Sequence, residues 1–250
     1  MSKKHRFLVL SDIHANIEAL EAVLHAVKRR RYHAVLCMGD LVGYGARPNQ
    51  VVNRVRRFPN LHIVRGNHDR VCCGLESPHN FNAAAKASAS WTLDRLSEDN
   101  RRYLTELPKG PLDTGLGAWI CHGSVTDEDL YMFSDFDAYQ AFEAVSFRIC
   151  FFGHTHLPYL YRQSPKGIDM VHLQGNAIEM RLDPVSRYLI NPGSVGQPRD
   201  RNPLASFAEF TPETGRLLLR RIPYDLDKTQ KCILKAGLPE NLAHRLSLGA

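Results

Sequence analysis

FLVLSDIHAN, residues 7–16, joins an apolar run directly to a polar turn. Four apolar residues bounded by polar ones predict a short buried strand, and apolar residues then recur at helical spacing over 17–27, with Asn16 as the expected N-cap. The stretch is therefore typical of a strand followed by a helix. Asp12 and His14 stand at the carboxyl end of that strand, so two side chains that can bind a metal leave a rigid element together.

The same order of elements repeats along the first third of the chain. An apolar run at 34–38 is followed by a glycine-rich turn, a predicted helix at 48–58 with Pro48 in its first turn, and a predicted strand at 61–64. Strands that alternate with helices pair in parallel and form a layered α/β fold. In such folds, ligands bind beyond the carboxyl ends of the strands.

Beyond the third strand the alternation breaks, and we expect two helices over about 71–107 that form a cap over one edge. The second half is predicted to be richer in β-structure, with strands at 118–121, 149–152 and 188–190. A helical segment at about 226–246, broken near Gly237, closes the chain. The length of 250 residues fits one domain better than two, so 1–250 is predicted to be a single domain.

Composition limits the class of protein. Apolar residues make up 44% of the chain, which is enough for a large core, yet no apolar run reaches the roughly 18 residues of a membrane span. No signal peptide is recognisable, and the six cysteines lack CxxC spacing and are interpreted as reduced core residues. We therefore expect a cytoplasmic protein. The net charge of +6 suits an anionic substrate or nucleic acid, although the basic clusters at 28–31 and 54–57 fit solvated helix faces better.

Five successive predicted strands end in side chains that can bind metals. These are Asp12 and His14, Asp40, Asn67 with His68 and Asp69, His122, and His154 with His156. Each end by itself is ordinary turn chemistry, and a lone histidine after a strand is usually a hydrogen-bonded turn residue. Together they would lie along one sheet edge, where a dense cluster of carboxylates and imidazoles is costly without a cation.

This series resembles the calcineurin-like metallophosphoesterase superfamily, whose five signature blocks match DxH (12–14), GD (39–40), GNHD (66–69), His122 and GHTH (153–156). The resemblance covers residues 7 to about 199 in the right order. It implies a four-layer α-β-β-α sandwich of two mixed sheets flanked by helices, with a dinuclear metal centre on the strand ends. Carried over residue by residue, it implies one metal on Asp12, His14 and His156, the other on Asn67, His122 and His154, and Asp40 as the bridge.

The residue types also fit phosphoester hydrolysis. Two divalent metals about 3.5–4 Å apart can share a hydroxide that attacks at neutral pH, and they stabilise the charge that develops on a phosphoryl oxygen. A bridging carboxylate such as Asp40 offers two anionic oxygens. A mixed nitrogen and oxygen ligand set without thiolate suits two ions of Mn, Fe, Zn, Co or Ni better than Mg or Ca, and it does not distinguish among the five.

His68 has a different expected role, because in the family pattern the histidine of GNHD is not a metal ligand. The resemblance implies that His68 is the general acid that protonates the leaving oxygen. The neighbouring carboxylate, Asp69, is then expected to hold or polarise His68. The alternative is a structural histidine that is hydrogen-bonded to its turn.

The second block departs from two better-known branches of the family. Protein Ser/Thr phosphatases and symmetrical diadenosine tetraphosphate hydrolases carry a phosphate-binding arginine in this block, whereas this chain has GDLVGYG, with Gly43 and Tyr44 in those places. A monoester dianion gains most from an added cation, so the missing arginine favours phosphodiesters.

The loop NPGSVGQPRD, residues 191–200, resembles the NPGS block of small bacterial and archaeal phosphodiesterases of the superfamily. Asn191 and Ser194 are expected either to bind the substrate phosphate or to order the metal shell, with a simple turn as the alternative. Arg199 could add positive charge to the phosphate site, although a surface position is favoured for it.

The favoured hypothesis is a metal-dependent hydrolase of small or nucleotide-like phosphodiesters, with Tyr131 and Phe133 able to stack a base. The cap residues 79–81 could meet a leaving group, but packing is the favoured role. Diadenosine polyphosphate hydrolysis and nuclease activity are close variants. The alternative from another class is a metal-binding scaffold without catalysis, like the retromer subunit with this fold, and the presence of His68 argues against it. We expect no membrane partner, and nothing in the sequence supports a polymeric nucleic acid.

Overall fold

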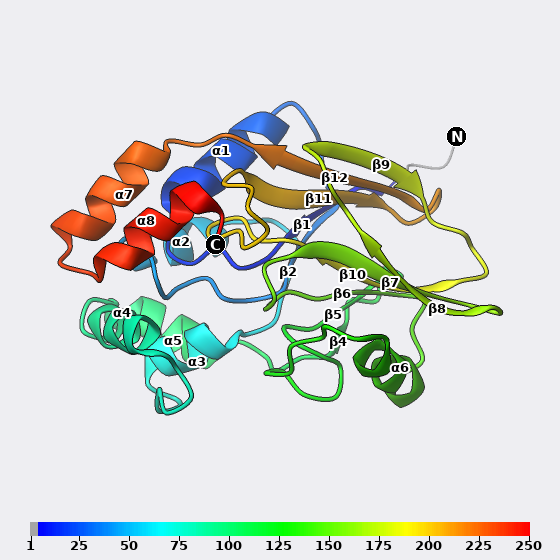
Figure 1. Cartoon of the computed structure of the whole chain (residues 1–250), viewed down its shortest axis with the longest axis horizontal. Helices are drawn as coiled ribbons and strands as arrows, with labels where there is room; N and C mark the ends of the chain where they lie inside the picture. Colours follow the sequence, from blue (N-terminus) through cyan, green and yellow to red (C-terminus); the bar gives the residue numbers. More distant parts are fainter. Residues whose placement is uncertain (1–4) are drawn as a thin grey trace.

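Two six-stranded sheets lie face to face in the computed structural model, which describes residues 5–250 (Figure 1). The first sheet has the order β3 (Leu61–Ile63), β2 (Ala34–Cys37), β1 (Phe7–Leu10), β11 (Ala205–Thr211), β12 (Arg216–Ile222) and β9 (Ala177–Arg181). The second has the order β4 (Leu112–Asp113), β5 (Trp119–Ile120), β6 (Ile149–Phe151), β10 (Arg187–Pro192), β7 (Pro158–Ser164) and β8 (Gly167–His172).

Both sheets are mixed, as predicted. β1 pairs in parallel with β2 and antiparallel with β11, and β10 pairs in parallel with β6 and antiparallel with β7. Helices α1 (Ile17–Val27) and α2 (Pro48–Val55) cover the first sheet, and α6 (Asp135–Ala144) covers the second (Figure 1). The four-layer α-β-β-α architecture is therefore confirmed.

The run FLVL is apolar throughout because β1 is covered on both faces. Successive side chains of a strand point to opposite faces of its sheet. Phe7 and Val9 lie in the apolar core between the two sheets, with Phe151 of β6, whereas Leu8 and Leu10 lie in the core beneath α1. Burying a side chain of this size contributes about 2 kcal/mol, so β1 is a firm platform for the turn that follows it.

The remaining helices lie at the end of the sandwich that carries the polar strand ends. They are α3 (Asn67–Cys73), the cap helices α4 (Ala83–Leu93) and α5 (Glu98–Thr105), and the C-terminal helices α7 (Leu226–Lys235) and α8 (Glu240–Leu248) (Figure 1). The GNHD block is thus the N-terminal turn of a helix. As predicted, Asn16 is the N-cap of α1, where its Oδ1 accepts a hydrogen bond of 3.0 Å from the Ala19 amide.

Several elements were not predicted, among them α6, β7, β11 and β12. β11 is buried along its whole length, so it lacks the alternation of apolar and polar residues that marks a half-exposed strand. Its Glu209 is buried and forms an ion pair with Arg30. The cysteines are unpaired, and five are buried, but Cys232 is only partly buried, which corrects its assignment to the core. Within residues 5–250, no helix has the length and apolar character of a membrane span.

Candidate metal centre

Two groups of buried side chains meet where the strand ends converge. One contains Asp12, His14, Asp40 and His156, and the other contains Asp40, His122 and His154. Asn67 adjoins the second group, with its Oδ1 3.1 Å from Nε2 of His122. The turns that carry them are joined through the backbone, since the Asp12 amide donates to the Gly39 carbonyl and the Gly153 amide to the His122 carbonyl. The structure thus brings together all seven residues expected to bind metals.

Asp40 occupies the midpoint of the two groups. Its Oδ2 lies 3.5 Å from Nε2 of His14 and 3.5 Å from Nε2 of His122, one histidine in each group. This oxygen is buried and has no hydrogen-bond partner among the described residues. A buried carboxylate oxygen without a partner is costly, and a cation on each side would satisfy it.

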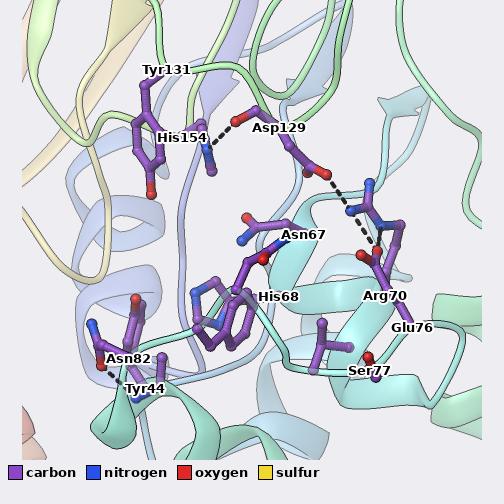
Figure 2. Close-up of a pocket in the computed structure, with 14 residues that line it drawn as sticks. Tyr44, Asn67, His68, Arg70, Glu76, Ser77, Asn82, Asp129, Tyr131 and His154 are labelled. Carbon is purple, nitrogen blue, oxygen red and sulfur yellow. Dashed lines mark hydrogen bonds and ion pairs between the residues drawn. The ribbon is translucent and has the colours of Figure 1, made fainter.

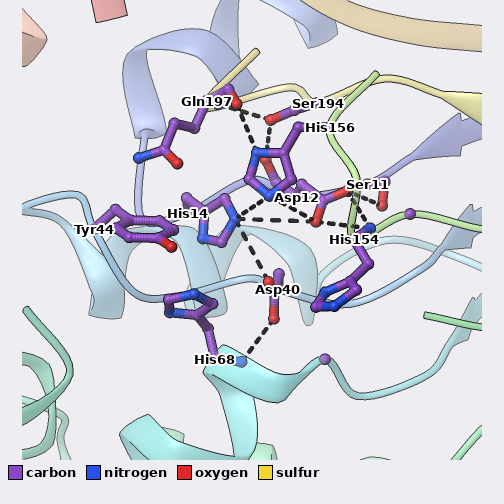
Figure 3. Close-up of polar contacts among 12 residues, drawn as sticks. Ser11, Asp12, His14, Asp40, Tyr44, His68, His154, His156, Ser194 and Gln197 are labelled. Atoms are coloured by element: carbon purple, nitrogen blue, oxygen red, sulfur yellow. Dashed lines mark hydrogen bonds and ion pairs between the residues drawn. The ribbon is translucent and has the colours of Figure 1, made fainter. Parts of the chain in front are cut away.

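The histidine nitrogens are spaced as ligands of a shared ion would be. Nε2 of His14 is 3.1 Å from Nε2 of His156 (Figure 3). Nε2 of His122 is 3.1 Å from Nδ1 of His154. Two nitrogens bound to one transition-metal ion lie about 3 Å apart, because each bond is about 2.1 Å long. The residues therefore fit a metal in each group.

Backbone carbonyls determine which nitrogen of each histidine faces the centre. The second ring nitrogen of each lies within hydrogen-bond distance of a carbonyl: His14 near Val42, His122 near Met38, His154 near Asp129, and His156 near Gln197. The distances are 2.6 to 3.1 Å. A ring that donates its proton outward to a carbonyl keeps a lone pair on the inner nitrogen, as metal binding requires. No sequence pattern marks these four carbonyls.

Most of the candidate ligands have strained backbone. Asp12, His14, Asp40, His154 and His156 all have positive φ angles, between 50° and 64°. Each residue of this kind costs about 1 kcal/mol or more in the left-handed region, and such strain persists only where the surroundings hold it. The tight turns direct consecutive ligands from each strand end into one small volume.

Asp69 holds two of these turns together. Its carboxylate accepts hydrogen bonds from the backbone amides of Asp40, Leu41, Val42 and Gly66, at 2.8 to 3.2 Å. Among the described residues it makes no hydrogen bond to the His68 ring. The expectation that Asp69 holds or polarises His68 is therefore corrected: the carboxylate fastens the GD turn to the start of α3, and it fixes His68 only through the helix backbone.

His68 lies beside the centre without belonging to either group of ligands. Its amide donates to Oδ1 of Asp40 at 2.9 Å, and its ring packs against the rings of Tyr44 and Phe81, at centroid distances of 4.3 and 4.4 Å. Nδ1 of the ring is buried and has no partner among residues 5–250. A Cβ at Gly43 would lie 2.4 Å from that nitrogen, so only glycine leaves room for the ring. Burial and the Arg199 charge lower the pKa of His68 well below its ordinary value.

The NPGS loop supports the centre from behind. Asn191 donates to the Gly153 carbonyl and accepts from the Gly193 amide, while Ser194 donates to the Asp12 carbonyl at 2.7 Å and accepts from the Gln197 amide. Both side chains are fully buried. Of the two roles expected for these residues, the contacts match the ordering of the turns that carry the candidate metal ligands. Direct binding of substrate is corrected, because their polar atoms are already used in these hydrogen bonds.

Arg199 does not lie free on the surface, which corrects the position favoured for it. Its Nη2 is 3.4 Å from the Tyr44 hydroxyl and 3.3 Å from Oε1 of Gln197. Its Nε is buried without a partner in the described part of the chain. The charge of Arg199 contributes to lowering the pKa of His14, His68 and His156, so a cation stands beside the centre.

A cavity of about 240 Å³ opens between the centre and the cap (Figure 2). Asn67, His68 and His154 line it on the metal side, and Phe81 and Asn82 line it on the cap side. The ring of Tyr131 stacks on His154 at 3.8 Å between centroids, and the exposed ring of Phe133 stacks on Tyr131 at 5.6 Å. The carboxylates of the cavity, those of Glu76 and Asp129, form ion pairs with Arg70.

Burial shifts the pKa values of the ligands in a way that predicts how metal binding depends on pH. Burial raises the pKa of Asp12 to about 7 and that of Asp40 well above its usual range, and it lowers the pKa of His14 and His156. In the metal-free protein near neutral pH, the imidazoles of His14 and His156 are therefore neutral, whereas the raised carboxyl pKa values favour protonated forms whose protons a metal must displace.

We expect the affinity for Mn²⁺ to rise about tenfold or more per pH unit below pH 7, and to level off above the raised pKa of the carboxyl groups. The sign follows because the protonated carboxyl groups lose protons on binding, whereas the neutral rings of His14 and His156 lose none. Calorimetric titration in two buffers of different ionisation enthalpy measures both affinity and proton release. An affinity that is independent of pH, without proton release, would contradict the assignment.

Comparison with known proteins agrees with this geometry. Residues 6–215 match the family model described as the calcineurin-like phosphoesterase superfamily domain. An uncharacterised protein of Methanocaldococcus jannaschii is 36% identical over 98% of this chain and 99% of its own length. The crystal structure of a metallophosphoesterase from Sphaerobacter thermophilus is similar, with a TM-score of 0.87, 37% identity and coverage of 99% of this chain and 100% of that one. A hypothetical protein from Pyrococcus horikoshii shares the fold, with a TM-score of 0.77, 20% identity and 98% coverage of both chains.

Proposed function

This chain belongs to the calcineurin-like phosphoesterase superfamily, and we propose that it is a dinuclear metal-dependent phosphodiesterase that acts on small or nucleotide-like substrates. The proposal depends above all on the position of Asp40. Its Oδ2 atom is buried, has no hydrogen-bond partner in the described chain, and lies 3.5 Å from a histidine of each ligand group.

The six cysteines are unpaired, which supports a reducing compartment such as the cytoplasm.

The ligand set supports two divalent transition-metal ions. Asp12, His14 and His156 would hold one, Asn67, His122 and His154 would hold the other, and Asp40 would bridge them. When bound, the ions supply a nucleophilic hydroxide at neutral pH and stabilise charge on the phosphoryl oxygens. Mn, Fe, Zn, Co and Ni all suit these nitrogen and oxygen donors.

His68 would donate the proton that the leaving oxygen needs. It lies between the ligand groups and the cavity, and its ring makes no hydrogen bond within residues 5–250. Because Nδ1 is buried against Gly43, Nε2 would be the atom that donates to a substrate oxygen. The phosphoryl oxygens beside this ring carry negative charge, which favours the protonated imidazole and so opposes the lowering of the His68 pKa by burial.

The cavity supports an uncharged, nucleoside-like leaving group. Its walls carry the aromatic rings of Tyr44, Phe81 and Tyr131 and amides such as Asn82, while its two carboxylates are neutralised by Arg70. Aromatic rings stack on bases, and amides can pair with their polar edges.

The first test compares bis-p-nitrophenyl phosphate with p-nitrophenyl phosphate, after the metals are removed by chelation and Mn²⁺ is restored. We expect turnover that requires the metal, with kcat/KM at least about tenfold higher for the diester, since the second block lacks the arginine that favours a dianion. Equal or faster hydrolysis of the monoester would contradict the diester preference. Two bound metals without turnover of either compound would favour the metal-binding scaffold.

A further inference from the structure

Tyr44 stands at the position of the missing arginine, and two arginines from distant parts of the chain surround its ring. The Cζ atoms of Arg199 and Arg245 each lie 5.9 Å from the centroid of the Tyr44 ring. The same ring lies 4.7 Å from the ring of His14 and 4.3 Å from that of His68. Both cations therefore contact a residue that is itself in contact with the candidate metal centre.

Both guanidinium groups keep free hydrogen-bond donors. Within residues 5–250, neither group has an Asp or Glu side chain within ion-pair distance. Arg199 uses Nη2 for the Tyr44 hydroxyl and Gln197, which leaves its buried Nε and its Nη1 unpartnered in the described chain. Arg245 uses Nε for the main-chain oxygen of Ala250, and both of its Nη atoms lack an acceptor there. A guanidinium group carries five N–H donors and normally meets anions through pairs of them.

The position of Arg245 is fixed by packing. Leu242 and Leu246 of α8 lie in one buried apolar cluster with Tyr44. The end of α8 is tied to the loop that bears Arg199, because the Arg201 amide donates to the Gly249 carbonyl at 2.8 Å. Figure 1 shows the end of α8 beside this loop. Burial and the charge of Arg199 lower the pKa of Arg245, a cost that an anion between the two groups would relieve.

The two arginines differ in their distance from the chemistry. The Arg199 amide donates to the His156 carbonyl at 3.4 Å, and its Nη2 contacts the side chain of Gln197, whose carbonyl orients His156. Arg245 contacts Tyr44 and the end of α8 instead. Arg199 is thus the inner cation and Arg245 the outer one. A phosphate group joined to the reacting phosphate through one oxygen lies about 3 Å farther out, which suits an outer cation.

We propose that Arg199, Arg245 and the Tyr44 hydroxyl bind a second phosphate of the substrate, joined directly to the reacting one. The inference rests on the proposed function and narrows its substrate class to diesters that carry a diphosphate or longer phosphate chain. An internal phosphate of such a chain has a single negative charge, like a simple diester, which agrees with the absence of the second-block arginine.

Equilibrium binding tests the site without turnover. Calorimetry on the Mn²⁺-loaded protein, at saturating free Mn²⁺, compares adenosine 5′-monophosphate with the non-hydrolysable α,β-methylene adenosine 5′-diphosphate. We expect the diphosphate to bind about tenfold more tightly, as one or two charge-assisted hydrogen bonds predict. In Arg245→Gln the ratio of the two affinities should fall to within about twofold. In Arg245→Lys, which keeps the charge, this ratio should be intermediate.

A matched control is Arg95→Gln. Arg95 also lies over an aromatic ring, that of Trp91, but it belongs to the cap, so this variant should keep the full ratio of affinities.

Equal affinity of the wild-type protein for the two nucleotides, or an unchanged ratio in both Arg245 variants, would overturn the inference. Hydrolysis of bis-p-nitrophenyl phosphate in the same preparation separates this result from the proposed function. Turnover without a diphosphate preference would overturn only the second-phosphate site. A preference that depends on Arg245 in a protein without turnover would support the site and overturn the phosphodiesterase assignment.

Discussion

Asp40→Asn is expected to lower kcat/KM for a phosphodiester by about 10³-fold or more. The substitution keeps the size of the side chain but removes the charge that lies between the two ligand groups, 3.5 Å from a histidine of each. The side-chain nitrogen of an amide cannot act as the second bridging donor, and losing one metal of a pair removes several kcal/mol of transition-state stabilisation. Elemental analysis of the metal content, measured with turnover, should show fewer than two ions per chain.

The control for this variant is Asp169→Asn in β8, where the exposed Asp169 forms an ion pair with Arg162 of the paired strand β7. It should bind metals and turn over diester as the wild type does. If Asp40→Asn kept both metals and more than about a tenth of the activity, the bridging role of Asp40 would be wrong.

His68→Ala is expected to lower kcat by about 10²- to 10⁴-fold for a diester with an alkyl leaving group, because such an oxygen needs a proton as it departs. With p-nitrophenolate, which leaves as a stable anion, the loss should be no more than about tenfold. His68 is outside both ligand groups, so the variant should still bind two metals. A loss of kcat that depends on the leaving group distinguishes a general acid from a residue that only shapes the site.

A matched control is His62→Ala in β3, a partly buried histidine outside the centre. It should show no dependence on the leaving group. An equal loss in His68→Ala for both kinds of diester would instead indicate that the ring positions its neighbours. Because the His68 ring packs against Tyr44 and Phe81, which line the cavity, losing a positioning role should also change KM.

The local part of the fold was predictable because it depends on residues that are close in the chain. FLVL followed by helical spacing predicts β1 and α1, and Asn16 caps that helix as expected. β11 was not predictable, since a strand buried on all sides loses its alternation and Glu209 interrupts its apolar run. Its place beside β1 depends on pairing across some 200 residues.

The same distinction holds for the site. Local sequence predicted the candidate donor atoms and their order, because DxH and GHTH each place two of them on one tight turn and GNHD places Asn67 at the start of a helix. The family pattern aligns these blocks. The partners that orient these side chains depend on tertiary packing. Carbonyls from Met38 and Gln197 direct the histidine rings, Asp69 fastens two turns instead of holding His68, and Arg245 reaches Tyr44 from the last helix. The spacing of residues within a turn determines which side chains that turn presents. The hydrogen-bond partners that orient those side chains come from any part of the chain that packing brings within about 3 Å, so no local sequence pattern predicts them.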